Sequence, residues 1–120
     1  MDYTREIILN VEPSSVIPVV RAKQGDSSFR FIKAKLMAGN SQLIPESGTT
    51  VTFREEKPDG TSITLNNAVV NNDGTITVTL AEQTTNRAGR CICDLCLTKN
   101  QKVLSTTSFV IDVLHSPTLG

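Results

Sequence analysis

The feature that most constrains the fold of this chain is the strict alternation of apolar and polar residues in Thr75-Ile76-Thr77-Val78-Thr79-Leu80. Successive side chains of a β-strand point to opposite faces, so this period predicts a strand with one buried face. Ile76, Val78 and Leu80 are expected to point inward. The same period predicts two more strands, in which the inward residues are Val51 and Phe53 in the first and Phe109, Ile111 and Val113 in the second.

Weaker alternation marks six further candidate strands. Proline has no N–H to donate to a β-ladder, so Pro13 and Pro18 favour a sheet edge for the early part of the chain. The six candidates are Glu6–Asn10, Val16–Ala22, Phe29–Met37, Ser62–Leu65, Arg90–Thr98 and a stretch near Val103. In the third candidate, alternate residues separate into an expected inner set and an outer set, namely Ile32, Ala34 and Leu36 inside and Lys33 and Lys35 outside.

Turn-forming residues separate these segments. Asp59-Gly60 and Asp73-Gly74 are flanked by β-branched residues and predict hairpin turns, in which glycine takes the left-handed conformation. The segment Ala81–Ala88 is too short and too polar for an amphipathic helix, so we expect a connecting turn there. Short strands spaced roughly ten residues apart favour a two-sheet antiparallel sandwich over a βαβ fold, which needs crossover helices. The sequence therefore predicts an all-β sandwich of about seven to nine strands.

Length and charge balance argue against several classes of protein. A chain of 120 residues is near the commonest size for one domain, and no linker divides it, so we expect residues 1–120 to form a single domain. Lys plus Arg number 12 and Asp plus Glu number 12, which argues against nucleic acid and anionic membranes as partners. The charged first residues and the lack of a long apolar segment predict neither a signal peptide nor a membrane span, hence synthesis in a cytoplasm.

Three cysteines in Cys91-Ile92-Cys93-Asp94-Leu95-Cys96 are the most conspicuous chemical motif. On a strand, Cys91 and Cys93 share one face whereas Cys96 points to the other, so the three sulfurs do not converge on one metal ion. An odd, clustered set also differs from a disulfide framework. We expect Cys91 and Cys93 to be small buried residues and Cys96 to be an exposed thiol.

The remaining polar residues do not predict a catalytic constellation. His115 is the only histidine, and the chain has neither a nucleophile elbow nor a carboxylate placed to orient it. Glu55 and Glu56 are adjacent on a strand and must face opposite ways; with Asp94 and Asp112, they are expected to be solvated outward charges. No glycine-rich phosphate loop is present. The sequence thus predicts no enzyme activity, no metal site and no cofactor.

Two further sets of residues bear on possible binding surfaces. The outward threonines are interpreted as strand formers that keep an exposed face soluble, rather than as an ice-binding or sugar-binding array. They are Thr50, Thr52, Thr75, Thr77 and Thr79. Interface hot spots favour Trp, Tyr and Arg, but the sequence does not reveal which candidates lie at an interface. The candidates are Tyr3, Arg5, Arg21, Arg30, Arg54, Arg87 and Arg90.

The order of several motifs resembles the N-terminal domain of phage baseplate upper proteins. The resemblance covers most of the chain from about Phe29 onward. The three cysteines have no match in that family's pattern, although alternation is retained there. The motifs that carry it are Phe29–Met37, Thr50-Val51-Thr52-Phe53, Lys57-Pro58-Asp59-Gly60-Thr61, Asp73–Leu80, Gly89 with Arg90–Leu97, Ser105-Thr106 and Phe109–Val113.

The resemblance implies an immunoglobulin-like sandwich in the tail baseplate of a phage or prophage of Gram-positive bacteria. It implies a virion structural protein that docks on the tail's central hub, forms homo-oligomers in the particle and supports receptor-binding parts during host attachment. It also implies a short family member or the N-terminal domain of a longer protein. The alternative is a carbohydrate-binding module for a cell-surface polysaccharide, which the absence of Trp and the single Tyr disfavour. A thiol-dependent enzyme using Cys96 is the third hypothesis.

Overall fold

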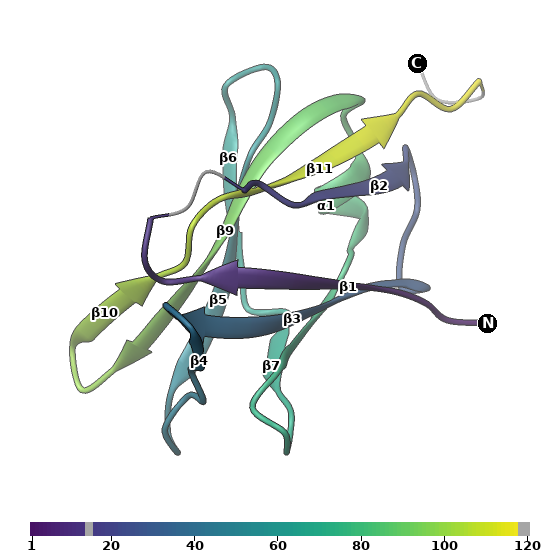
Figure 1. Cartoon of the computed structure of the whole chain (residues 1–120). Coiled ribbons are helices and arrows are strands. Elements are labelled where there is room, and N and C mark those ends of the chain that lie inside the picture. The colour runs from purple at the N-terminus through teal and green to yellow at the C-terminus, as the bar shows by residue number, and fades with distance from the viewer. Residues whose placement is uncertain (14–15, 118–120) are drawn as a thin grey trace.

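The computed structural model describes residues 1–13 and 16–117, and in these it contains eleven strands and one helical turn. They form two facing β-sheets (Figure 1). The five-stranded sheet contains β1 (Tyr3–Asn10), β3 (Arg30–Ala38), β4 (Ser41–Gln42), β7 (Ala68–Val70) and β8 (Ile76–Thr79). The six-stranded sheet contains β2 (Val19–Lys23), β5 (Thr50–Glu56), β6 (Ser62–Leu65), β9 (Gly89–Lys99), β10 (Lys102–Ser105) and β11 (Phe109–Leu114).

The predicted all-β sandwich is confirmed, with two differences in detail. Two short strands that the sequence pattern did not mark, β4 and β7, raise the number of strands within the described residues to eleven. The sheets are also mixed, because β1 pairs with β3 and β2 pairs with β11 in parallel. β1 and β3 are connected through β2 in the other sheet, whereas β2 and β11 are separated by strands of both sheets.

The hydrophobic core lies between the sheets and contains every residue that alternation placed inside. The rings of Phe53 and Phe109, from β5 and β11, meet at its centre with 6.2 Å between their centroids. Burying a side chain of this size stabilises the fold by about 1.5–3 kcal/mol. The confirmed inner residues are Ile32, Ala34, Leu36, Val51, Phe53, Ile76, Val78, Leu80, Phe109, Ile111 and Val113.

The two Asp-Gly-Thr triplets form turns of the same construction, as their shared sequence predicts. In each, the aspartate Oδ1 accepts hydrogen bonds from the N–H and the hydroxyl of the threonine, at 3.0 and 2.6 Å. Gly60 and Gly74 have φ values of +87° and +84°, a conformation that residues with a side chain rarely adopt. Both turns close hairpins, β5–β6 and β7–β8.

The edge position predicted from the early prolines is confirmed. β2 begins at Val19, directly after Pro18, and lies at the edge of the six-stranded sheet. The C=O of Pro18 still accepts a hydrogen bond from the N–H of Val110, at 2.9 Å. Residues 16–18 of the predicted strand Val16–Ala22 thus precede β2 and are not part of it.

The connection expected at residues 81–88 contains a single helical turn, α1 (Glu82–Thr85). No helix in the described parts of the chain has the length and apolar character needed to cross a membrane. The short connection places Gln83 above the end of β5, where it takes part in the polar cluster described next.

Candidate interaction surface

The three cysteines lie on β9 as alternation predicts, with one correction. Cys91 and Cys93 point into the core and are fully buried, as expected. Cys96 points to the outer face but is only 9% exposed, so the expectation of an exposed thiol is wrong. Its cross-strand neighbours are Thr52 and Ser105, and the guanidinium of Arg54 reaches over this face to donate to Ser105 Oγ at 3.1 Å. Neighbouring polar side chains therefore cover a thiol that points away from the core.

The core thiols are poorly suited to nucleophilic chemistry. Desolvation and the charge of Glu55 raise the pKa of Cys91 to about 12, and desolvation raises the pKa of Cys93 still further. A thiol must be deprotonated to attack or to bind a metal, so both remain inert at neutral pH. His115 is exposed beyond β11, far along the chain from these thiols. Within the described residues, no group of three His, Cys, Asp or Glu side chains is arranged to hold a metal ion.

Glu55 is the second correction, because it is 2% exposed rather than solvated. Alternation along β5 places Glu55 on the same inner face as Val51 and Phe53, while Glu56 faces outward. Lys57 continues this face, and its buried Nζ lies 3.2 Å from Glu55 Oε1 and donates also to the C=O of Gln83 in α1. Glu55 Oε2 has no hydrogen-bond partner within residues 1–13 and 16–117. Burial raises the pKa of Glu55, and the charge of Lys57 opposes that rise.

We call Glu55, Lys57, Cys91 and Gln83 the closed end of the sandwich. Glu55, Lys57 and Cys91 are buried there, whereas Gln83 is exposed and contributes its backbone C=O, which accepts from Lys57 Nζ. Gly89 at the start of β9 also lies against Pro58, so closely that an added Cβ would be 2.7 Å from Pro58 Cγ. At position 89 the chain is thus packed too closely against Pro58 to accept a side chain.

The outer face of the six-stranded sheet has its own ion pair. Arg54 and Asp94 are directly opposite on β5 and β9, and two hydrogen bonds of 2.7 and 2.6 Å join the guanidinium to the carboxylate. This bidentate geometry raises the pKa of Arg54. Asp94 does point outward as predicted, but it is bonded rather than free.

The predicted threonine face needs one correction. Thr75 is buried, because its hydroxyl donates to Asp73 Oδ1 at 2.6 Å and accepts from Asn71 Nδ2 at 3.0 Å inside the β7–β8 turn. The other four threonines of that set are half-buried or exposed. A flat array of aligned hydroxyls is therefore broken at this turn.

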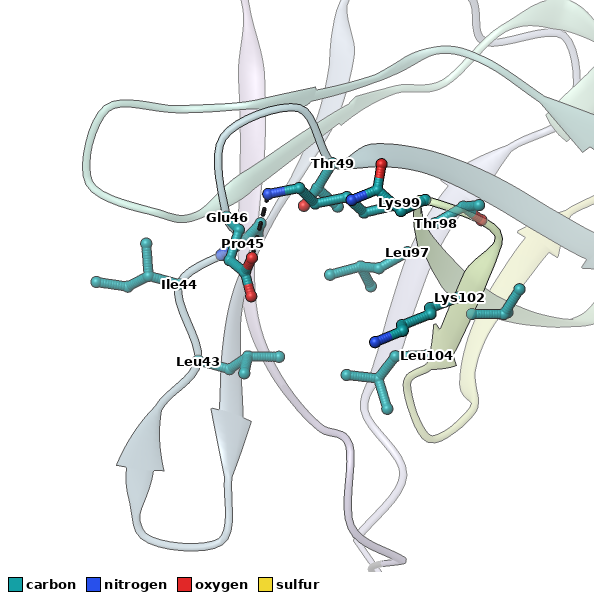
Figure 2. A pocket seen from close by; sticks show the side chains of 12 residues that line it. Leu43, Ile44, Pro45, Glu46, Thr49, Leu97, Thr98, Lys99, Lys102 and Leu104 are labelled. Carbon is teal, nitrogen blue, oxygen red and sulfur yellow. Dashed lines mark hydrogen bonds and ion pairs between the residues drawn. The ribbon is translucent and has the colours of Figure 1, made fainter.

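A groove opens at the opposite end of β5 and β9 from the closed end. It has a volume of about 350 Å³ and lies between the segment Leu43–Glu46 and the β9–β10 hairpin. Figure 2 shows Leu43 and Leu104 pointing toward one another across it, with Leu97 on the same side as Leu104. Other lining residues, which complete what we call the open groove, are Ile44, Pro45, Glu46, Thr49, Thr98, Lys99, Asn100, Lys102 and Val103.

The wall of the open groove formed by residues 43–46 is fixed in place by three contacts. The N–H of Leu43 donates to the C=O of Leu36 at 2.9 Å. Ile44 packs on the β7–β8 turn, where a Cβ added to Gly74 would lie 2.9 Å from Ile44 Cγ1. Lys99 Nζ binds Glu46 Oε1 at 3.1 Å across the mouth of the groove (Figure 2). The open groove is therefore a formed feature of the surface.

The β9–β10 hairpin exposes apolar side chains beside the groove. Val103 is 65% exposed and Leu104 is 43% exposed, although both are apolar residues in a strand. Lys102 makes no ion pair with any described residue. An apolar depression with a charged rim is the usual composition of a protein–protein contact.

None of the hot-spot candidates expected from composition lines the open groove. Arg54 is bonded to Asp94, Arg87 lies 3.5 Å from Asp59, and Arg30 pairs with Asp26 while lying over the ring of Tyr3. Tyr3, Arg5 and Arg21 line a separate depression between β1 and β2. Sequence reasoning missed the groove residues. The available signal was the pair of adjacent apolar residues in Leu43-Ile44 and in Val103-Leu104, since adjacent residues on extended chain cannot both face the core.

Comparison with known proteins gives a match over nearly the whole chain. The sequence model of the BppU N-terminal domain family, the N-terminal domain of baseplate upper proteins, matches residues 5–118. Among solved structures, the N-terminal domain of phage TP901-1 ORF48 is similar in fold, with a TM-score of 0.65 and 18% sequence identity. That similarity covers 92% of this chain and 98% of the other. No curated protein matched the sequence.

Proposed function

Because this chain belongs to the family of baseplate upper protein N-terminal domains, we propose that it is a non-enzymatic structural module of a phage or prophage tail baseplate. In this role it docks on the tail hub, joins neighbouring baseplate proteins and supports receptor-binding parts. The observation that carries the proposal is the family match over residues 5–118. The structure supports it with a two-sheet sandwich that carries a formed groove, the open groove, on its surface.

The chemistry of the described residues supports a non-enzymatic role. The core thiols are held protonated by burial, and the one strongly perturbed carboxylate, Glu55, lies inside the fold beside Lys57. A catalytic group must reach its substrate, and these groups are shielded from solvent. Their perturbed pKa values are explained by burial in a structural cluster.

The open groove supports contact with protein rather than with a polysaccharide. Its lining contains leucine, isoleucine, proline and valine side chains, and no aromatic ring among the residues that form it. Sugar rings are bound mostly by stacking on aromatic faces, whereas apolar depressions with a polar rim are typical of protein contacts. We therefore place the contact with neighbouring baseplate proteins at the open groove.

Purification of tail particles tests the proposal. The chain would be tagged in its parent phage or prophage, and tail particles would be separated on a density gradient and probed for the tag. We expect the tag to comigrate with tails and immunogold to mark the baseplate end. Its absence from intact particles would contradict the proposal.

Matched substitutions then test the contact at the open groove. Leu104→Asp places a charge at the groove, whereas Ile92→Asp places one on the outer face of β9, where Ile92 is similarly exposed at 51%. Incorporation into particles should fall at least tenfold for Leu104→Asp and stay near wild type for Ile92→Asp. Equal incorporation of the two variants would show that the contact does not lie at the open groove.

A further inference from the structure

The strand β10 has an edge that no other described strand covers. It pairs with β9 on one side only, and β11, which also pairs with β9, begins farther along that strand. Figure 1 shows β10 at the end of the molecule away from the N-terminus. An uncovered strand presents unpaired N–H and C=O groups, which can hydrogen-bond to another chain.

The hydrogen bonds around β10 identify which backbone groups are free. Thr106 N–H donates to Leu95 C=O at 3.0 Å, and Leu95 N–H donates to Thr106 Oγ1 at 3.1 Å, so the N–H of residue 106 points toward β9. Residues whose backbone groups point toward the partner strand alternate along a ladder, so Leu104 and Lys102 also bond to β9. The N–H and C=O groups of Val103 and Ser105 therefore point away from β9, toward the uncovered side.

The direction of the side chains connects this edge to the open groove. Leu104 is opposite Leu97, a core residue, and so lies on the inner face of the six-stranded sheet, over the groove. A strand added beside β10 would project alternate side chains onto the same face. The side chain opposite Leu104 would enter the groove between Leu104 and the wall at Leu43.

From this geometry we propose that the added strand is β10 of a second copy of this chain, paired antiparallel about a two-fold axis at Leu104. Val103 of each copy then exchanges both backbone hydrogen bonds with Ser105 of the other. The two Leu104 side chains meet and each covers the groove of the other copy. The proposal rests on the proposed function, because it names the neighbour at the groove.

The charges allow a second copy as the occupant, and the short strand sets the strength of the contact. In this register Lys102 is opposite Thr106 of the other copy, so the two lysines do not face each other. The formal net charge of the chain is zero at pH 7, so two copies do not repel one another through their net charge. Two four-residue strands bury too little area for a tight dimer, so the contact is weak in solution and is strengthened by the high local concentration in an assembled particle.

Disulfide trapping tests the register. Directly opposite residues in a non-hydrogen-bonded antiparallel pair have Cα atoms about 4.5 Å apart, within the range that a disulfide spans. Leu104→Cys should give a covalent dimer when two thiols are oxidised by diamide, which takes up their hydrogen atoms. Lys102→Cys is the matched control. In the proposed register residue 102 is opposite residue 106 of the other copy, so the Cα atoms of the two residues 102 are at least about 13 Å apart, too far for a disulfide. The three native cysteines are buried, so the wild-type chain should give no covalent dimer with diamide.

A backbone substitution separates strand pairing from random collision. Val103→Pro removes the outward N–H without affecting the ladder to β9, so the fold should be kept. We expect Leu104→Cys to cross-link at least tenfold faster than Lys102→Cys, and Val103→Pro to reduce that rate to the control level. Equal rates for the two cysteine variants, or a rate that is insensitive to the proline, would overturn the proposal. Because this assay uses the purified chain, its failure is distinct from absence of the chain in tail particles.

Discussion

The two ends of the sandwich differ in which side chains they bury. β5 and β9 run from one end to the other, and both carry inner-face residues along their whole length. At the closed end, even charged groups are buried, since Lys57 lies 3.2 Å from Glu55 and is covered by α1. At the open groove, apolar Val103 and Leu104 are exposed and one edge of β10 pairs with no described strand. Folding of one chain thus buries even the charged groups of the closed end, whereas it leaves apolar side chains of the open groove exposed.

The largest expected effect is at the closed end. Lys57→Met leaves the buried carboxylate of Glu55 without its partner, and breaking a buried pair in this way costs about 3–5 kcal/mol. Lys102→Met at the open groove breaks no ion pair and should change the free energy of unfolding by less than about 0.5 kcal/mol. Urea denaturation of both variants measures the difference. If Lys57→Met were no more harmful than Lys102→Met, the two ends would not differ as described.

A second prediction uses the paired turns to test how rigid the groove wall is. Gly60→Ala and Gly74→Ala impose the same positive-φ strain, but a Cβ has open space at Gly60 and lies 2.9 Å from Ile44 at Gly74. Gly74→Ala should therefore cost at least about 1 kcal/mol more in unfolding free energy, the usual scale of overpacking.

The double variant Gly74→Ala/Ile44→Ala checks the physical reason for that difference. Removing Cγ1 and Cγ2 of Ile44 should recover most of the extra cost, since only Ile44 Cβ then remains, at 3.3 Å, and a double-mutant cycle measures this directly. Equal costs at the two glycines would mean that Ile44 yields easily and that the wall of the open groove is soft.

The third prediction concerns pH. The folded pKa of Glu55 is raised above its ordinary value of 4.5, so between that value and the folded pKa the folded state keeps a proton that the unfolded state has lost. Stability from Glu55 is thus complete below pH 4.5 and is lost as the pH rises through the folded pKa. Compared with Glu55→Gln, wild type should lose unfolding free energy as the pH is raised from 4 to 8.

The comparison with Glu55→Gln is needed because other groups act in the opposite direction. Hydrogen bonds from Thr61 and Thr75 lower the pKa values of Asp59 and Asp73, so their contributions are lost as the pH falls. Both aspartates are present in wild type and variant, so their effect cancels in the difference. If the unfolding free energy of wild type rose relative to that of Glu55→Gln as the pH increased, the burial of an incompletely paired Glu55 would be contradicted.

The smallest expected effect is on stability at the open groove. Leu104→Asp should change the free energy of unfolding by less than about 0.5 kcal/mol, because the side chain is already substantially exposed. Thermal and urea unfolding of wild type and variant provide the measurement. A large loss would show that Leu104 belongs to the core of the isolated chain and not to a contact surface.

Period-two alternation predicted the core well because burial on a strand depends on local geometry. The same reasoning would have placed Glu55 inside, since it is two residues from Phe53; the charge of the side chain gave the wrong expectation. Cys96 was misjudged for another reason, because its cover comes from Thr52, Arg54 and Ser105, which are remote in sequence. Partners across strands depend on pairing, which the pattern of one segment does not contain.

The parallel pairing and the open groove could not be predicted from alternation for a related reason. The choice of β3 as the neighbour of β1 is made by the path between sheets, which no local signal encodes. The groove depends on the placement of Leu43 opposite Leu104, more than sixty residues later. The local sequence signal for the open groove is a pair of adjacent apolar residues on each side, a pattern that alternation does not account for.

The central claim is that the free edge of β10, beside the open groove, pairs with β10 of a second copy. Amide hydrogen exchange at β10 tests this claim most directly. In a dilute wild-type sample, the N–H groups of Val103 and Ser105 should exchange quickly, while those of Leu104 and of the β5–β9 ladder are protected. In the Leu104→Cys covalent dimer, Val103 and Ser105 should become protected as well. Protection of both amides in the dilute monomer, or rapid exchange of both in the dimer, would contradict the claim.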